Sequence, residues 1–153
     1  MPRTSGTSRT SAASRAAIAD AGPLVAFLDR AERHHGWAVA CVDELKAPLL
    51  VCEPVLAEAM HLLAHLPAAQ DALFGLLKRG ALSTALRGED HVSELHRLLQ
   101  KYRDQPMSLA DACIVRMAEL YDRHYVLTLD RDFLVYREHG RVPLAVLYPA
   151  ESG

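Results

Sequence analysis

The sequence lacks the features that mark several specialised classes of protein. Cysteine is scarce, with three residues among 153, and an odd number without paired spacing indicates reduced thiols, not a disulfide framework. The apolar runs are too short to span a membrane. The amino-terminal segment has no apolar core of the kind that a secretory signal requires. We therefore expect a cytoplasmic protein with no membrane contact.

An excess of positive charge is also missing. The formal net charge is −2 at pH 7, so the surface as a whole gives no basic footprint for tight binding of nucleic acid. Hydrophobic residues make up 50% and charged residues 24% of the chain, which is typical of a globular protein. A chain of 153 residues predicts one domain large enough to bury a core.

Both ends of the chain are set apart from the middle. Residues 1–15 are rich in Ser, Thr, Ala and Arg and contain no acid, a composition that predicts a disordered tail. An organelle transit peptide, or a start codon assigned too early, would also account for it. We expect the folded domain to occupy residues 16–149, with a short carboxyl-terminal tail at 150–153.

Strands and helices alternate along the domain. Continuous apolar runs are typical of parallel strands covered on both faces, and short apolar runs predict strands at 16–19, 49–52, 82–85, 126–129 and 143–147. Helical spacing of apolar residues predicts helices at 22–33, 37–46, 53–66, 68–79, 89–103 and 108–121, and a short last helix at 133–140. This alternation predicts an α/β fold, a three-layer α/β/α sandwich around a small parallel sheet.

Four acidic residues stand where strands end or helices begin. Asp20 and Asp130 each follow a predicted strand, and Asp111 lies near the start of a helix. Glu58 falls between Val55 and Leu62 on an apolar helix stripe, which predicts a buried side chain. Ligands of open parallel α/β sheets bind outside the carboxyl ends of the strands. We therefore expect these acids to face one crevice.

Each acid also has a purely structural interpretation. Asp20 can be a turn or cap residue, Asp111 can complete a capping box with Ser108, and Asp130 can cap the last helix. Glu58 fits such an interpretation least. A buried carboxylate needs a partner or a metal, and no Lys or Arg stands within one helical turn of it.

A cluster of four carboxylates requires a compensating charge. Two carboxylates about 4 Å apart repel by about 4 kcal/mol at an effective dielectric of about 20. Oxygen-only ligands suit Mg²⁺ or Mn²⁺, and such a metal activates water for attack on a phosphodiester. A metal-dependent phosphatase remains an alternative, although the haloacid type needs Asp-x-Asp after its first strand. Here that spacing occurs only at Asp130 and Asp132.

The acids belong to four short motifs in a fixed order. The motifs read Asp20-Ala-Gly-Pro-Leu-Val-Ala, Pro54-Val-Leu-Ala-Glu58, Ser108-Leu-Ala-Asp111-Ala and Leu127-Thr-Leu-Asp130-Arg-Asp132-Phe. In this order and spacing they resemble the PIN-domain family, and are most similar to the VapC-type toxins of bacterial toxin–antitoxin modules. The resemblance covers about residues 16–149.

The resemblance implies a metal-dependent endoribonuclease that cleaves RNA. The four acids match the family's catalytic and metal-binding quartet: Asp20, Glu58, Asp111 and Asp130. Asp132 matches a position that is sometimes acidic and is a further candidate metal ligand. Thr128 matches a hydroxyl often found beside the site and is a candidate for positioning the substrate. The family also implies a homodimer and a small antitoxin that blocks the cleft.

One departure from the family pattern follows the first acid. Many relatives have Thr-Ser or Ser-Ser there, whereas this chain has Ala21-Gly22, so a hydroxyl contact to bound water is lost. A PIN-like domain that binds RNA or a protein partner without cutting is the second alternative, which the intact quartet disfavours.

Five cations in one helical region are predicted to line a basic groove of the dimer: Arg79, Arg87, Arg97, Lys101 and Arg103.

Overall fold

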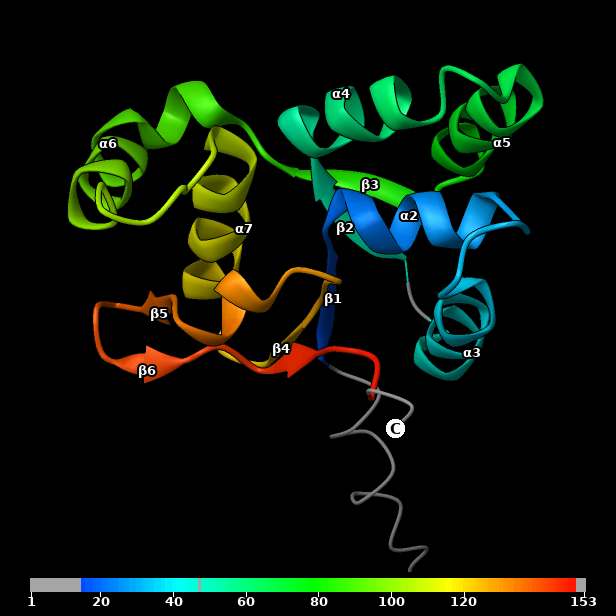
Figure 1. The fold of residues 1–153 in the computed structure, drawn as a ribbon. Helices are drawn as coiled ribbons and strands as arrows, with labels where there is room; N and C mark the ends of the chain where they lie inside the picture. Colours follow the sequence, from blue (N-terminus) through cyan, green and yellow to red (C-terminus); the bar gives the residue numbers. More distant parts are fainter. Residues whose placement is uncertain (1–14, 47, 151–153) are drawn as a thin grey trace, which may run out of the picture.

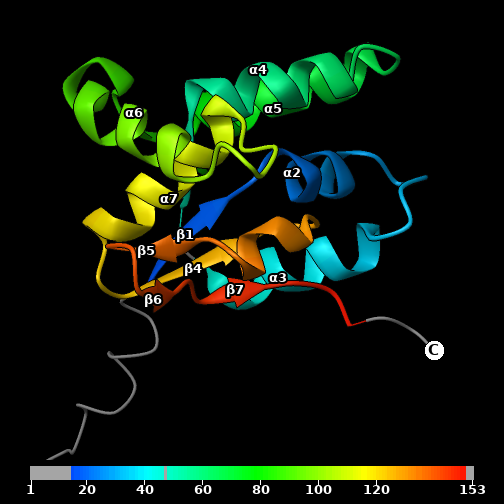
Figure 2. The same cartoon turned by 60° about the vertical axis from the view of Figure 1, so that its left-hand side comes forward.

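The computed structural model describes residues 15–46 and 48–150, and a five-stranded parallel sheet lies at its centre. The strands are ordered β3-β2-β1-β4-β7 (Figures 1 and 2). Their bounds are β1 Ala16–Ala19, β2 Leu49–Cys52, β3 Leu82–Leu86, β4 His124–Leu127 and β7 Val146–Leu147. β1 is the middle strand, and its Ile18 lies opposite Leu50 of β2 and Val126 of β4.

Helices cover both faces of this sheet. α7 (Leu109–Leu120) packs across β1, β2, β3 and β4, and α6 (Val92–Lys101) packs on α7. The helices α2 (Ala21–Leu28), α3 (His35–Leu45), α4 (Glu53–Leu62) and α5 (Pro67–Lys78) lie on the other side of the strands (Figure 1). The predicted three-layer α/β/α sandwich with a small parallel sheet is confirmed.

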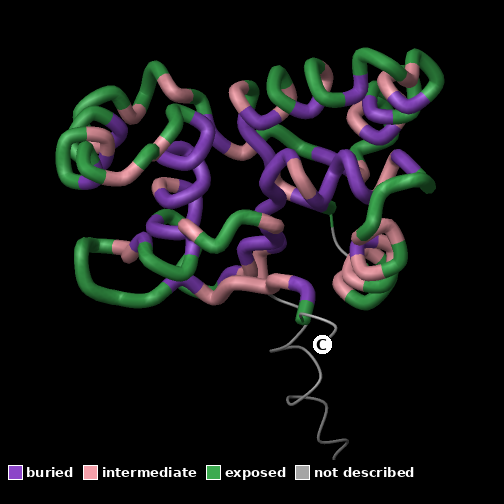
Figure 3. Tube along the Cα trace, viewed as in Figure 1, coloured by how far each residue is buried: buried purple, intermediate pink, exposed green. Residues whose placement is uncertain are grey.

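The core follows α7 and the middle strands. Nine of the 12 residues of α7 are buried, because α7 lies between the sheet and α6 and has little free surface. Figure 3 shows buried residues along α7, β1 and α2, whereas α6 and the region of β5 and β6 are mostly exposed. Since most of its residues are buried, α7 holds a fixed position, and so does the acid at its start.

β4 begins and ends two residues earlier than the sequence predicts. The register places Ala16 opposite His124 and Ala19 opposite Leu127, so β4 ends where its partner β1 ends. Thr128 and Leu129, predicted as strand residues, therefore lie beyond the carboxyl edge of the sheet. This shift brings the Thr128 side chain beside the acids.

The segment after Asp130 is a short 3₁₀ helix and a hairpin, not the predicted helix. The 3₁₀ helix η2 spans Arg131–Leu134, and β5 (Arg137–Glu138) pairs antiparallel with β6 (Val142–Pro143). His139 and Gly140 both have positive φ, at 49° and 76°, which reverses the chain and prevents a helix. The predicted strand at 143–147 is accordingly divided between β6 and β7.

Several helix boundaries also differ from the predicted ones. Pro67 occupies the first turn of α5, where its missing N–H costs nothing, and the helix before it already ends at Leu62. The predicted helix at 89–103 is divided into the 3₁₀ helix η1 (Gly88–His91) and α6. α3 begins at His35, so Gly36 lies in its first turn and does not separate two helices.

Two expectations about the chain as a whole can be compared with the structure. Within residues 15–46 and 48–150, no helix combines the length and apolarity that crossing a bilayer requires. The three cysteines, all in described positions, form no disulfide; Cys52 and Cys113 are buried and Cys41 is half-buried. The predicted tails, except Arg15 and Ala150, lie outside the described residues.

Candidate active site

The four predicted acids line one pocket at the carboxyl edge of the sheet. Asp20 follows β1, Glu58 comes from α4, Asp111 from α7, and Asp130 follows β4. The pocket, called here the acid pocket, has a volume of about 440 Å³. It is lined by Asp20, Pro54, Glu58, Pro106, Ser108, Leu109, Ala110, Asp111 and Asp130. The sheet thus brings together residues that are up to 110 positions apart in the sequence.

Asp20 is buried and held at both carboxylate oxygens. Oδ1 accepts a hydrogen bond from the N–H of Ala21 at 2.8 Å, and Oδ2 accepts one from the hydroxyl of Thr128 at 2.9 Å. Burial raises the pKa of Asp20 to about 6; the two hydrogen bonds oppose this shift, and the charges of Asp111 and Glu58 add to it. A carboxylate in this setting gains from a nearby cation.

Thr128 connects two of the acids. Its side chain is fully buried; the hydroxyl donates to Asp20 and accepts the N–H of Asp130 at 2.9 Å. The sequence predicted that this hydroxyl positions the substrate. That role stays a prediction; in the structure the hydroxyl orients Asp20 and holds the backbone that carries Asp130.

Asp111 combines the structural interpretation with the functional one. It forms a capping box at the start of α7: its N–H donates to the hydroxyl of Ser108 at 3.0 Å, and its Oδ2 accepts the N–H of Ser108 at 3.3 Å. The same Oδ2 accepts a hydrogen bond from the hydroxyl of Tyr136 at 3.2 Å. Burial raises the pKa of Asp111, the hydrogen bonds oppose this, and the charge of Asp130 adds to it.

Tyr136 is the residue of the site that the sequence analysis missed. Its side chain is fully buried and makes edge-to-face contacts with Tyr102 and Phe133, with ring centroids 5.0 Å and 5.2 Å apart. Burial raises the pKa of the Tyr136 hydroxyl, and the neighbouring Asp111 charge adds to the rise, so the group stays a donor. Its position four residues after Asp132 was the only signal in the sequence, and that signal is weak.

The remaining acids are more exposed. Glu58 is exposed, so the predicted burial of this side chain is wrong: α4 turns Val55 and Ala59 inward and leaves Glu58 at the rim of the acid pocket. Asp130 is also exposed and caps η2, accepting the N–H of Asp132 at 2.9 Å. Asp132 lies outside the lining of the acid pocket, and its role as a metal ligand stays a prediction.

The charge of the acid pocket is not balanced by its own lining. No Lys or Arg among the described residues lines the pocket, and the pKa values of its two buried aspartates are raised. An all-oxygen, negatively charged lining fits Mg²⁺ or Mn²⁺. In the part of the chain that the structure describes, no three acid, His or Cys side chains are already drawn together around one ion position.

The departure at Ala21-Gly22 has a packing reason. A Cβ atom built on Gly22 would lie 3.2 Å from the side chain of Leu129, which is closer than ordinary carbon contacts. Leu129, the second residue after β4, therefore occupies the space that a side chain at position 22 would need. A hydroxyl still reaches Asp20, but it comes from Thr128.

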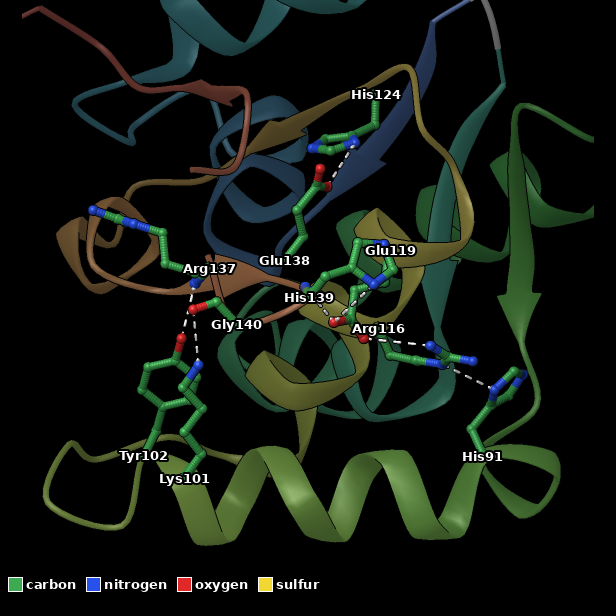
Figure 4. A network of polar contacts seen from close by, with 10 residues as sticks. All are labelled: His91, Lys101, Tyr102, Arg116, Glu119, His124, Arg137, Glu138, His139 and Gly140. Carbon is green, nitrogen blue, oxygen red and sulfur yellow. Dashed lines mark hydrogen bonds and ion pairs between the residues drawn. The ribbon is translucent and has the colours of Figure 1, made fainter. Parts of the chain in front are cut away.

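A polar network holds the segment that carries Tyr136 against α6 and α7 (Figure 4). The N–H of His139 donates to Glu119 of α7 at 2.7 Å, and Lys101 of α6 donates to the carbonyl of Gly140 at 3.2 Å. The N–H of Arg137 donates to the hydroxyl of Tyr102 at 2.9 Å. These contacts fix the chain immediately after Tyr136, and so help to fix its hydroxyl on Asp111.

Comparison with known proteins identifies the family of the chain. A family model of the PIN domain matches residues 17–138. The chain belongs to the PIN-domain family. It is 34% identical over 116 residues to ribonuclease VapC26 of Mycobacterium tuberculosis, covering 74% of this chain and 86% of that protein. This similarity confirms the predicted resemblance to VapC-type PIN proteins.

The PIN fold of the chain is also similar to that of a solved toxin. VapC20 of Mycobacterium tuberculosis, a toxin that cleaves the sarcin–ricin loop, matches with a TM-score of 0.68 and 15% sequence identity. The match covers 76% of this chain and 92% of VapC20. At this identity the comparison supports the PIN fold alone.

The cations predicted to form a basic groove are spread along this PIN domain. Arg87 pairs with Glu89 at 2.9 Å on the surface, and Lys101 lies over the ring of Tyr102 at 5.4 Å. Arg79 precedes β3 and Arg87 follows it, so these two lie at opposite ends of this strand. The basic groove therefore stays a prediction.

Proposed function

We propose that this PIN domain is a metal-dependent endoribonuclease that cleaves RNA phosphodiester bonds, as the toxin of a toxin–antitoxin pair. One observation carries the proposal. Four carboxylates from four separate elements line one pocket, and no cationic side chain among the described residues lines it with them. Membership of the PIN family and similarity to a protein named ribonuclease VapC26 support RNA as the substrate.

The proposed roles follow from burial. Asp20 and Asp111 are buried and each is held by neutral hydrogen-bond donors, so their orientation is set before any ligand binds. Glu58 and Asp130 stand exposed at the rim and complete the ligand set, with Asp132 as an outer candidate. Mg²⁺ or Mn²⁺ held by these acids would supply activation of water and stabilisation of the leaving oxygen.

The proposal extends to partners and to location. A small antitoxin that covers the acid pocket and a homodimer are expected from the similarity to VapC-type proteins. Three free cysteines, two of them buried, suit a reducing cytoplasm. Light scattering at micromolar concentration tests the dimer, and a monomer would contradict it.

The test of the activity uses purified protein without antitoxin. Incubation with structured and unstructured RNAs in Mn²⁺ or Mg²⁺ is expected to give internal cleavage that EDTA abolishes. Asp111→Asn is expected to remove the activity. His61→Asn, which substitutes an exposed residue of α4, should leave the activity intact. Cleavage that survives EDTA would reject the metal-dependent mechanism, and no cleavage of any RNA would reject the ribonuclease.

A further inference from the structure

A second and larger pocket adjoins the acid pocket. It has a volume of about 1140 Å³ and lies between the end of β3, η1, α6 and the starts of α4 and α7. Pro54 and Leu109 line both pockets, so the two adjoin at these residues. We call this second space the side pocket. The side pocket is therefore the space next to the acids at which the scissile phosphate is proposed to bind.

The side pocket has an apolar wall and an acidic rim. Leu86 and Leu95 are buried in the wall, and Val92 is 63% exposed. Three acids lie on the rim, Glu53, Glu89 and Asp90, while the one Arg of the described lining, Arg87, is already paired with Glu89. Such a surface repels a phosphate group, but it suits the apolar faces and amino groups of a nucleobase.

A three-residue relay presents His91 to this pocket. Glu119 is buried, and its Oε1 accepts a hydrogen bond from Arg116 Nη1 at 3.4 Å. Arg116 Nε in turn donates to His91 Nδ1 at 3.2 Å (Figure 4). A guanidinium only donates, so Nδ1 must be the acceptor, and the ring proton is on Nε2. His91 lines the side pocket, and the relay leaves its Nε2–H as a donor directed away from Arg116.

We infer that the side pocket holds an unstacked RNA base next to the scissile phosphate, with His91 Nε2–H donating a hydrogen bond to an acceptor on the base edge. The inference rests on the proposed ribonuclease function and adds a substrate-binding residue to it. The side pocket, with a volume of about 1140 Å³, is larger than the roughly 300–1,000 Å³ of ordinary ligand pockets. It therefore has room for a nucleobase. Rim carboxylates accept hydrogen bonds from amino groups, which adenine, guanine and cytosine carry and uracil lacks.

Two substitutions at one position separate the donor from the relay. In His91→Asn the side-chain oxygen can replace Nδ1 as the acceptor for Arg116, but nothing reaches the position of Nε2. In His91→Gln the amide reaches that position and can donate there. His61→Asn is the matched control, because His61 is exposed and lines neither pocket. Each protein is incubated with a randomised single-stranded RNA pool in Mn²⁺, the rate of cleavage is measured, and the cleaved ends are sequenced.

The wild type is expected to prefer adenine, guanine or cytosine over uracil at one position beside the cut. Every base offers an acceptor to His91, so His91→Asn should slow cleavage of the whole pool about 3- to 10-fold, the value of one hydrogen bond, while His91→Gln and His61→Asn keep the wild-type rate. Val92→Glu, which adds an acid to the pocket and leaves His91 in place, should also slow cleavage and provides a second test if His91→Asn does not fold.

Three results would overturn the inference. Wild-type cleavage rates in both His91→Asn and Val92→Glu would leave the side pocket to a protein partner. Wild-type cleavage without any base preference would reject the base pocket but keep the proposed function. No cleavage of the pool by the wild type would reject both.

Discussion

The hydroxyl of Tyr136 donates a hydrogen bond to Oδ2 of Asp111, and the N–H of Ser108 donates to the same oxygen. Among the described residues, no hydrogen bond falls on Oδ1 of Asp111. The carboxylate is therefore held by one oxygen and leaves the other for the acid pocket. Neutral donors orient the group without cancelling its charge, which a Lys or Arg in the same place would do.

Tyr136→Phe is expected to lower Mn²⁺ affinity about tenfold, because residues that orient a metal ligand typically contribute this much. The ring keeps its contact with Phe133, so the melting temperature in EDTA should change little. Isothermal titration with Mn²⁺ measures the affinity. Tyr102→Phe is the comparison from the same aromatic cluster. The Tyr102 hydroxyl accepts a hydrogen bond from Arg137 and acts on Asp111 only through the chain after Tyr136, so its removal should lower the Mn²⁺ affinity less. Equal losses in both variants would assign Tyr136 a packing role only.

Asp111→Asn is expected to abolish RNA cleavage while metal-free stability holds or rises. The raised pKa of Asp111 means that its surroundings disfavour the charge, and an amide removes that charge while keeping an oxygen for Ser108 and Tyr136. Melting curves with EDTA and with Mg²⁺ measure both effects, since a bound ion stabilises the folded state. A mutant that melts lower in EDTA, yet gains as much from Mg²⁺ as the wild type, would make Asp111 a helix cap only.

Metal-free stability should fall as pH rises from about 4 to 7. The folded state keeps a proton on Asp20 up to a pKa of about 6, above the ordinary value of 3.8, so it binds more protons than the unfolded state between these values. This stabilisation is fully present below pH 3.8, the ordinary pKa of Asp, and is lost as the pH rises through the folded-state pKa of about 6. The free energy of unfolding should fall by about 3 kcal/mol over this range. Urea titrations in EDTA across this range measure it. Asp20→Asn should remove most of the slope, and an unchanged slope would contradict the assignment.

Thr128→Val should destabilise the protein by about 1–3 kcal/mol, because the N–H of Asp130 loses its acceptor and Asp20 loses a donor. Mn²⁺ affinity should fall with it, since both acids become less ordered. Thr128→Ser keeps the hydroxyl and should retain the affinity, with a smaller stability loss for the missing methyl group. Calorimetric titration with Mn²⁺ measures the affinity of the two variants, and urea unfolding measures their stability. If the serine variant loses as much affinity as the valine variant, the hydroxyl is not the relevant group.

The sequence by itself determined the fold class and the position of each acid along the chain. Parallel strands with continuous apolar runs, such as β1 and β2, are readable because burial on both faces excludes polar residues. The caps at Asp20, Asp111 and Asp130 were also readable, because each depends on neighbours within three residues. These local bonds turned out to orient the carboxylates, so the structural and functional interpretations of the acids are compatible.

Only the tertiary structure decided which groups hold the acids and which acids are buried. Glu58 was misplaced because helical spacing identifies an apolar stripe but not where its edge meets solvent. The register of β4 depends on β1, more than 100 residues earlier, and it alone puts Thr128 behind Asp20. Tyr136 reaches Asp111 because β5 and its turn are bonded to α6 and α7, and contacts over such separations leave no periodic signal in the sequence.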